Sequence, residues 1–116
     1  MDGPYYRGDV YWADLDPQKG SEQGGRRPAV VVQIEAFNRT GNTLLVVPFT
    51  TNLKRAKLPS SVFVTGSQSN GLTQDSVALC HQVRVIDKSG VKTRLGTLEA
   101  DSFREIEKAL RMILGL

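Results

Sequence analysis

The apolar residues of the chain fall into short runs that turn-forming residues separate. β-Branched and aromatic residues fill these runs, and glycine, proline or polar clusters lie between them. We expect strands at residues 9–14, 28–34, 43–49 and 61–64, and a long or bent strand pair at 75–87. Loops or turns are expected at 16–25, 38–42, 52–58 and 66–71, and residues 88–96 are expected to be irregular and basic. This pattern predicts a mainly β protein.

Two of the predicted strands also indicate how they pack. The run Ala29-Val30-Val31-Val32 is apolar without alternation, which is typical of a strand that is buried on both faces. Pro48 lies near the end of the next strand, and because proline has no amide hydrogen, strand pairing must stop or bulge there.

The C-terminal segment has a helical period instead. Its apolar residues recur at steps of three and four, at Phe103, Ile106, Leu110 and Ile113. This spacing predicts an amphipathic helix from about residue 99 onward, and acidic residues at its start suit the positive end of the helix dipole. Several short strands followed by one packing helix predict a small, SH3-like, partly open barrel that forms a single domain over residues 1–116.

Length and charge narrow the function only slightly. A domain of 116 residues buries about two-thirds of its unfolded surface, so dimerisation would be a natural way to bury more. The net charge of +3 and the sequence pI of about 9.2 are compatible with a phosphate-bearing partner. A charge excess of this size is also common on ordinary soluble domains, so it does not identify the partner.

The single cysteine and the N-terminus bear on the cellular compartment. Cys80 cannot form an intramolecular disulfide, and its apolar neighbours favour a buried thiol over a nucleophile. Residues 1–6 lack the basic start and apolar segment of a secretory signal, and no apolar run is long enough to cross a membrane. We therefore expect a cytoplasmic protein without a membrane span.

The chain offers few ligands for a metal or a nucleotide cofactor. With one histidine and one cysteine it has no spacing that suits zinc, and Asp14 and Asp16 form a close pair of carboxylates beside a turn. Two-metal nucleases need more converging carboxylates than this, so a solvated turn is the favoured role of the pair. A phosphate-binding loop of the P-loop type is absent from the sequence. We expect no metal and no cofactor.

The strongest candidate for chemistry combines two segments. Residues 20–28 place polar side chains in a loop and then Arg27 at the start of a buried strand, where the following proline restricts it to extended conformations. Residues 47–52 end another buried strand with two threonines and an asparagine. If these strands are neighbours, Arg27 and Thr50 could face one site at the rim of the barrel.

Such a pair suits the cleavage of RNA. The 2′-hydroxyl of RNA is an internal nucleophile beside the scissile phosphate, so the substrate itself supplies proximity. A guanidinium offers a planar fork of donors to the phosphorane oxygens, and a threonine hydroxyl can donate one more hydrogen bond. Arginine as a general base would need a large pKa change and is the weak step. The alternative is that Arg27 pairs with a carboxylate such as Glu22, while Thr50 and Thr51 are ordinary strand-end residues.

A series of motifs resembles the signature of the MazF/PemK toxins. The motifs are residues 7–17 (RGDVYWADLDP), 19–25 (KGSEQGG) with Arg27-Pro28, 47–51 (VPFTT), Leu58-Pro59, 75–77 (DSV), 82–84 (QVR) and 95–98 (LGTL) before the helix. The similarity runs from about Arg7 to the C-terminus, and the Gly-Ser-Glu-Gln-Gly loop with its Arg-Pro is the most specific part.

The resemblance implies a fold and an activity. It implies a homodimer of CcdB/MazF-like barrels, acting as a metal-independent, sequence-specific endoribonuclease on single-stranded RNA. The implied products carry a 2′,3′-cyclic phosphate and a 5′-hydroxyl, and the implied partner is a cognate antitoxin whose disordered tail occupies the RNA groove.

The resemblance also implies roles for single residues. The catalytic arginine of the family matches Arg27 rather than Arg26, and its catalytic threonine matches Thr50. The predicted RNA-binding residues are Ser21, Glu22, Gln23, Thr51, Asn52, Ser76, His81 and Gln82.

His81 departs from the family pattern, in which an acidic residue usually precedes the glutamine. An imidazole at this position could contact phosphate or assist proton transfer near neutral pH. We favour a strand-end histidine that faces solvent or alters the base preference.

Three other features have alternative roles. The basic stretch at 54–57 either follows the RNA backbone or is a solvated loop. Trp12 and Phe49 could stack on bases, but we interpret both as aromatic residues of the β core.

A non-enzymatic binding module is the main alternative to a nuclease. Small barrels often serve only to bind, and related toxins of this architecture can poison DNA gyrase by binding it. The Ser-Glu-Gln-Gly loop together with Arg27 and Thr50 points away from this alternative.

Overall fold

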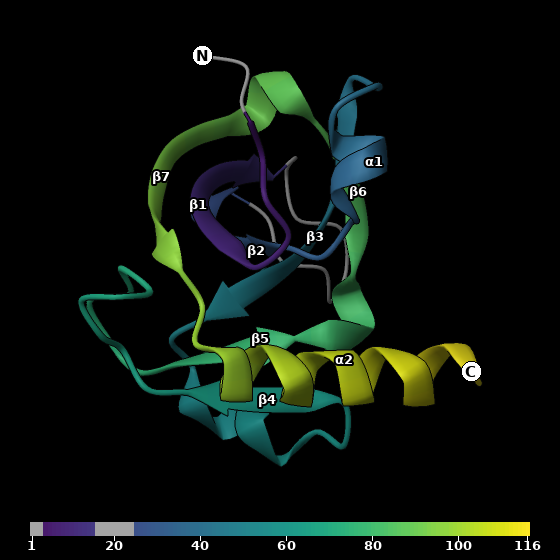
Figure 1. Cartoon of the computed structure of the whole chain (residues 1–116). Coiled ribbons are helices and arrows are strands. Elements are labelled where there is room, and N and C mark those ends of the chain that lie inside the picture. The colour runs from purple at the N-terminus through teal and green to yellow at the C-terminus, as the bar shows by residue number, and fades with distance from the viewer. Residues whose placement is uncertain (1–3, 16–24) are drawn as a thin grey trace.

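The computed structural model describes residues 4–15 and 25–116, which form an antiparallel sheet with a helix packed against it (Figure 1). The strands are β1 (Asp9–Leu15), β2 (Gly25–Val31), β3 (Thr43–Thr50), β4 (Ser61–Val64), β5 (Ser76–Leu79), β6 (Arg84–Asp87) and β7 (Val91–Thr97). The helices are α1 (Glu35–Asn38) and α2 (Ala100–Leu114), with short 3₁₀ helices η1 (Leu53–Lys57), η2 (Cys80–Gln82) and η3 (Lys88–Gly90). The predicted mainly β fold with a C-terminal helix is confirmed.

The sheet follows the order β4-β5-β3-β2-β1-β7, and β6 also pairs with β3. Every one of these pairs is antiparallel. β4 and β7 end the path of the described strands and do not pair with each other, so the sheet stays open. The predicted partly open barrel is therefore confirmed.

β3 changes its partner along its length. Residues 43–46 pair with β6, whereas Phe49 and Thr50 pair with β5. Pro48 lies between these two sets and cannot donate a backbone hydrogen bond. The predicted interruption at Pro48 is confirmed on this edge of β3, while on the other edge Pro48 stays in register with Ala29 of β2.

β2 is buried on both faces, as its apolar run predicts. Val30 belongs to a hydrophobic cluster that includes Val10 of β1 and Ile106 of α2. Val31, which follows it and therefore points to the opposite face, belongs to a second cluster that includes Leu44 of β3. The two clusters together make up the core, one on each side of the central strands.

α2 covers the first of these clusters and lies beside β4 (Figure 1). Its buried residues are Ile106 and Ala109, on one face of the amphipathic helix that the sequence predicts. It ends at Gly115, whose φ of +72° is left-handed, and the amide of Leu116 donates to the carbonyl oxygen of Arg111 at 2.9 Å. Within the described part of the chain, no helix is long and apolar enough to cross a membrane.

Residues 88–96 are not irregular, and the prediction for this segment was wrong. They contain η3 and most of β7, which pairs with β1. The buried carboxylate of Asp9 accepts hydrogen bonds from Nε of Arg94 at 3.1 Å and from the hydroxyl of Thr97 at 3.0 Å. The basic residues of β7 obscure its strand pattern, and the partner that stabilises Arg94 lies far away in the sequence.

Smaller differences concern the ends of elements. β2 spans 25–31 rather than the predicted 28–34, so Arg27 lies within the strand. α1 precedes the turn predicted at 38–42, η1 lies in the loop predicted at 52–58, and η2 separates the strand pair predicted at 75–87. Such short helical turns are stabilised by local backbone hydrogen bonds and leave little periodic pattern in the sequence.

The polar turn predicted at 66–71 surrounds a buried asparagine. The side-chain oxygen of Asn70 accepts hydrogen bonds from two loop amides, and its nitrogen donates to the carboxylate of Glu99 at 2.9 Å. The next residue, Gly71, has a φ of +74° and lies against Leu95. A Cβ at this glycine would lie 2.2 Å from the carbonyl oxygen of Leu95.

We expect Gly71→Ala to destabilise the fold strongly. The positive φ alone costs a non-glycine residue about 1–3 kcal/mol, and the clash with Leu95 adds to this cost. Gly41→Ala is the matched control, because the nearest atom to its Cβ would be the carbonyl oxygen of Phe37 at 3.9 Å and its φ is not positive. Urea unfolding followed by circular dichroism compares the two variants, and equal stabilities would contradict the prediction.

Candidate active site

Arg27 and Thr50 lie on adjacent strands and line the same pocket. Ala29 of β2 is in register with Pro48 of β3, and each candidate lies two residues beyond that pair on its own strand. Because strand side chains alternate with a period of two, both candidates lie on the same face of the pair. The pocket between them has a volume of about 240 Å³. The two strand ends that the sequence singled out therefore meet at one site.

The pocket collects residues from four strands and their ends. It is lined by Trp12, Arg26, Arg27, Pro28, Phe49, Thr50, Thr51 and Ser76. Thr51 and Ser76 are also among the predicted RNA-binding residues. Thr51 is exposed, whereas Ser76 is buried and its hydroxyl donates to the carbonyl oxygen of Gln74 at 3.0 Å.

The guanidinium of Arg27 is held beside the end of β3. Its Nη1 donates to the carbonyl oxygen of Phe49 at 3.3 Å, one residue before Thr50. Burial lowers the pKa of Arg27 from its ordinary value. A guanidinium nevertheless stays protonated in proteins, so Arg27 is suited to act as a cationic hydrogen-bond donor.

The hydroxyl of Thr50 is largely buried, and its orientation is set by the chain that follows. Oγ1 accepts a hydrogen bond from the amide of Asn52 at 3.2 Å, and the residue is 8% exposed. The side chain of Asn52 in turn accepts from the amide of Lys54 and caps η1. Since the Asn52 amide occupies an acceptor position of the hydroxyl, the proton of Thr50 remains available for donation.

The structure does not gather all predicted site residues in this pocket. Asn52 contacts Thr50 through its backbone amide but does not line the pocket. His81 and Gln82 line another pocket of about 320 Å³, together with Val83, Arg84 and Val85. Ser21, Glu22 and Gln23 lie outside the described residues, and so does the proposed pairing of Arg27 with Glu22.

His81 is exposed, as expected, but it lies in η2 rather than at the end of a strand. Its Nε2 lies 3.4 Å from Nε2 of Gln82. Burial lowers the pKa of His81, and the positive charge of Arg55 lowers it further. Its imidazole is therefore neutral at pH 7, and its protonation disfavours the folded state as the pH falls below the ordinary value of 6.5.

The two aromatic residues of the pocket differ in burial. Phe49 is 1% exposed and belongs to the core, as predicted. Trp12 is 37% exposed, so the interpretation of this residue as part of the core was wrong. Sequence reasoning also left Arg26 out of the site, although it lines the pocket beside Arg27. The places of Trp12 and Arg26 follow from the pairing of Trp12 with Pro28 and of Asp14 with Arg26. That pairing requires the register of β1 against β2, which the sequence does not give.

Cys80 is a buried residue of the core, as the sequence predicts. Burial raises the pKa of its thiol to about 12, so the thiol stays protonated at physiological pH and is a poor nucleophile. Among residues 4–15 and 25–116, no three or more histidine, cysteine, aspartate or glutamate side chains come together as metal ligands. Asp14 is exposed at the end of β1, and Asp16 lies outside the described residues.

We expect Arg55→Ala to raise the pKa of His81 without restoring it fully, because burial still disfavours the charged imidazole. Lys57→Ala removes a charge of the same sign from the same 3₁₀ helix, and it is the matched control because the charge effect on the pKa of His81 is attributed to Arg55. The chain has one histidine, so a proton NMR titration follows this imidazole alone. An unchanged pKa in Arg55→Ala would contradict the assigned cause.

Comparisons with known proteins agree with this architecture. The sequence model of the family described as "PemK-like, MazF-like toxin of type II toxin-antitoxin system" matches residues 6–114. Among curated proteins, the chain is similar to the endoribonuclease MazF of Staphylococcus saprophyticus. The two are 41% identical over 110 residues, which cover 95% of this chain and 91% of that protein.

Solved structures share the fold over nearly the whole chain. MazF from Deinococcus radiodurans superposes with a TM-score of 0.82 at 30% identity, covering 97% of each chain. An endoribonuclease from Mycobacterial species, solved in complex with its cognate antitoxin, gives a TM-score of 0.72 at 28% identity, covering 100% of this chain and 97% of that one. By sequence and by structure, this chain belongs to the PemK-like, MazF-like toxins of type II toxin–antitoxin systems.

Proposed function

We propose that this toxin is an endoribonuclease that cleaves single-stranded RNA at specific sequences, with Arg27 and Thr50 as its catalytic residues and without a metal ion. The observation that carries the proposal is the pocket that both residues line. The activity is supported by the relative from Staphylococcus saprophyticus, which is named an endoribonuclease. The products would carry a 2′,3′-cyclic phosphate and a 5′-hydroxyl.

Arg27 and Thr50 would act on the charge that develops during cleavage. The 2′-oxygen forms a bond to phosphorus as it loses its proton, and the bond from phosphorus to the 5′-oxygen breaks as that oxygen gains one. The guanidinium of Arg27 would donate to the non-bridging oxygens, which carry most charge in the phosphorane. The hydroxyl of Thr50, oriented by the amide of Asn52, would donate one further hydrogen bond. Neither role requires Arg27 to lose its proton.

Residues around the pocket would hold the RNA on either side of the cleaved phosphate. Thr51 and Ser76 line the pocket itself, and Asn52 caps η1, which carries Lys54, Arg55 and Lys57. Cationic side chains in this position add salt-dependent affinity for the phosphate backbone. We propose that His81 and Gln82, in their separate pocket, contact a nucleotide further along the strand. Ser21, Glu22 and Gln23 remain proposed RNA contacts.

We also propose two protein partners. One is a cognate antitoxin, since MazF of Deinococcus radiodurans was solved with MazE and the mycobacterial endoribonuclease with its own antitoxin. The other is a second copy of this chain. The C-terminal end of α2 exposes large apolar residues, and burying them against another copy would stabilise a domain of this size. The exposed residues at this end are Met112, Ile113, Leu114 and Leu116.

The test is cleavage of a long RNA by the purified protein in EDTA, followed by analysis of the new ends. We expect discrete fragments with cyclic phosphate and 5′-hydroxyl ends. Arg27→Ala and Thr50→Val should each lower the rate by roughly 10²- to 10³-fold, because each removes a donor to the transition state. Thr50→Ser keeps the hydroxyl and should retain most activity.

Arg39→Ala is the matched control for the loss of an arginine, because Arg39 is an exposed residue at the end of α1 and does not line the pocket. Intact RNA with the wild-type protein would favour the non-catalytic module, such as a gyrase-binding toxin. Cleavage that EDTA abolishes would indicate a different class of nuclease. If Arg39→Ala lowered the cleavage rate as much as Arg27→Ala does, Arg27 would have no specific catalytic role.

A further inference from the structure

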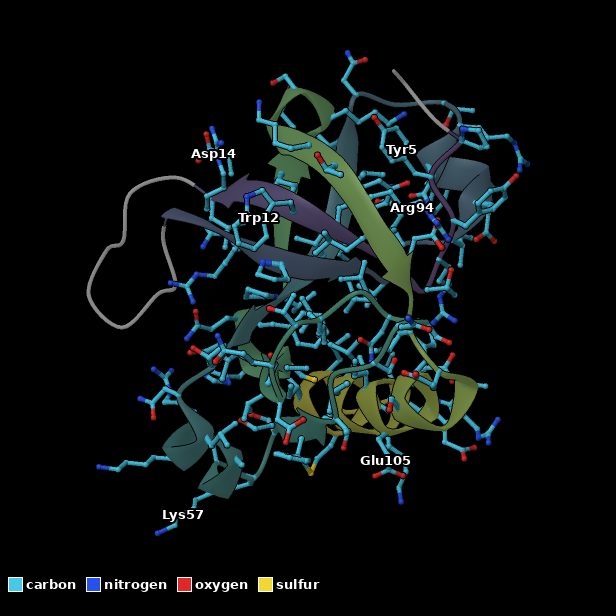
Figure 2. All side chains as sticks on the ribbon, turned by 90° about the vertical axis from the view of Figure 1, so that its left-hand side faces the viewer. Tyr5, Trp12, Asp14, Lys57, Arg94 and Glu105 are labelled. Atoms are coloured by element: carbon cyan, nitrogen blue, oxygen red, sulfur yellow. The ribbon has the colours of Figure 1, made fainter. Side chains whose placement is uncertain are left out.

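Trp12 has an unusual position for the only tryptophan of a small β protein. Along β1, Tyr11, Ala13 and Leu15 are buried, whereas Trp12 and Asp14 lie on the opposite, exposed side. Trp12 is 37% exposed and belongs to neither hydrophobic cluster of the core. Figure 2 shows Trp12 near Asp14, on the side of the molecule away from Tyr5 and Arg94. More than a third of its surface is therefore left accessible, outside the two hydrophobic clusters of the core.

The indole is next to the proposed catalytic residues. Trp12 is in register with Pro28 of β2, and Pro28 directly follows Arg27. Trp12 and Pro28 both line the pocket that contains Arg27 and Thr50. Directly opposed residues of antiparallel strands lie on the same face, so the indole has a rigid proline as its cross-strand neighbour. This arrangement leaves an aromatic ring at the wall of a site that would hold a phosphate.

The charges around the indole favour a nucleic acid over an apolar ligand. Arg26 and Arg27 line the same pocket, and Arg26 is exposed. Proteins that hold single strands combine cationic groups for the backbone with aromatic rings on which bases stack. A phosphate between Arg27 and Thr50 would bring the bases of its two nucleotides to the pocket walls, and Trp12 is the exposed aromatic residue among those that line it.

We propose that Trp12 is a base-stacking residue for a nucleotide adjoining the cleaved phosphate. This inference rests on the proposed function, because it requires a single-stranded RNA in the pocket. Stacking tolerates any base, since every base has a π face. Trp12 therefore contributes affinity and position, while the choice of sequence comes from polar contacts elsewhere.

The test measures binding of an RNA oligonucleotide that contains a cleavage site and carries 2′-O-methyl groups, which block the internal nucleophile. The chain has one tryptophan, so its intrinsic fluorescence reports on Trp12 alone. We expect the fluorescence to be quenched on binding. Replacing one base beside the cleavage point with an abasic site should remove most of that quenching. Fluorescence anisotropy of a labelled oligonucleotide gives the affinity independently.

Trp12→Ala should raise the Kd by roughly 5- to 150-fold, because it removes one stacked base contact. Trp12→Phe should retain most of the affinity, and the preferred cleavage sites should stay the same in both variants. Phe37→Ala is the matched control, since Phe37 is an exposed aromatic residue of α1, 63% accessible, that does not line the pocket. We expect its affinity to equal that of the wild type.

Several results would overturn the proposal. Tight binding by anisotropy without quenching would show that no base stacks on Trp12, while leaving the proposed function intact. The proposal would also be overturned if Trp12→Ala bound with wild-type affinity. The same holds if oligonucleotides with an abasic site at any position quenched the fluorescence of Trp12 equally. If Trp12→Ala does not fold, the fluorescence quenching and the abasic scan with the wild-type protein show whether a base stacks on Trp12. Wild-type protein that neither binds nor cleaves RNA would reject both this inference and the proposed function.

Discussion

The pairing of β2 with β3 is the constraint on which the proposed site depends. The register of Ala29 with Pro48 determines which residues lie side by side where the two strands leave their regular pairing. A shift of one residue would turn Arg27 or Thr50 to the opposite face, because side chains alternate along a strand. The register is held in place by burial, since Val30 and Val31 fill separate clusters on the two faces of β2. The core thus fixes the geometry of the pocket at its edge.

Pro48 lies where β3 changes its partner, two residues before Thr50 of the pocket. β3 exchanges β6 for β5 across this residue, which has no amide hydrogen to donate to either neighbour. Two residues after Pro48, Thr50 pairs with Val77 of β5. Ser76, which precedes Val77, lines the pocket with Thr50. The local structure, the packing and the site are therefore linked through one residue that sequence analysis identified only as an interruption.

Sequence alone gives the elements that follow a local pattern, and it fails where partners are distant. The spacing around Ile106 predicts α2, and the run around Val30 predicts a strand buried on both faces. β7 was missed because Arg94 is stabilised by an ion pair with Asp9, which lies near the other end of the chain. The exposure of Trp12 and the separation of His81 from the pocket depend on strand register and on the turn of η2, which no short-range pattern contains.

The central claim is that Arg27 and Thr50 act on a single phosphate, and a double-mutant cycle tests it most directly. Single-turnover cleavage rates are compared for the wild type, Arg27→Ala, Thr50→Val and the double variant. Residues that stabilise one transition state together are strongly non-additive, so the double variant should be little slower than the slower single variant. If the fold-loss in rate of the double variant equalled the product of the two single losses, the residues would act independently. That result would contradict a shared action on one phosphate.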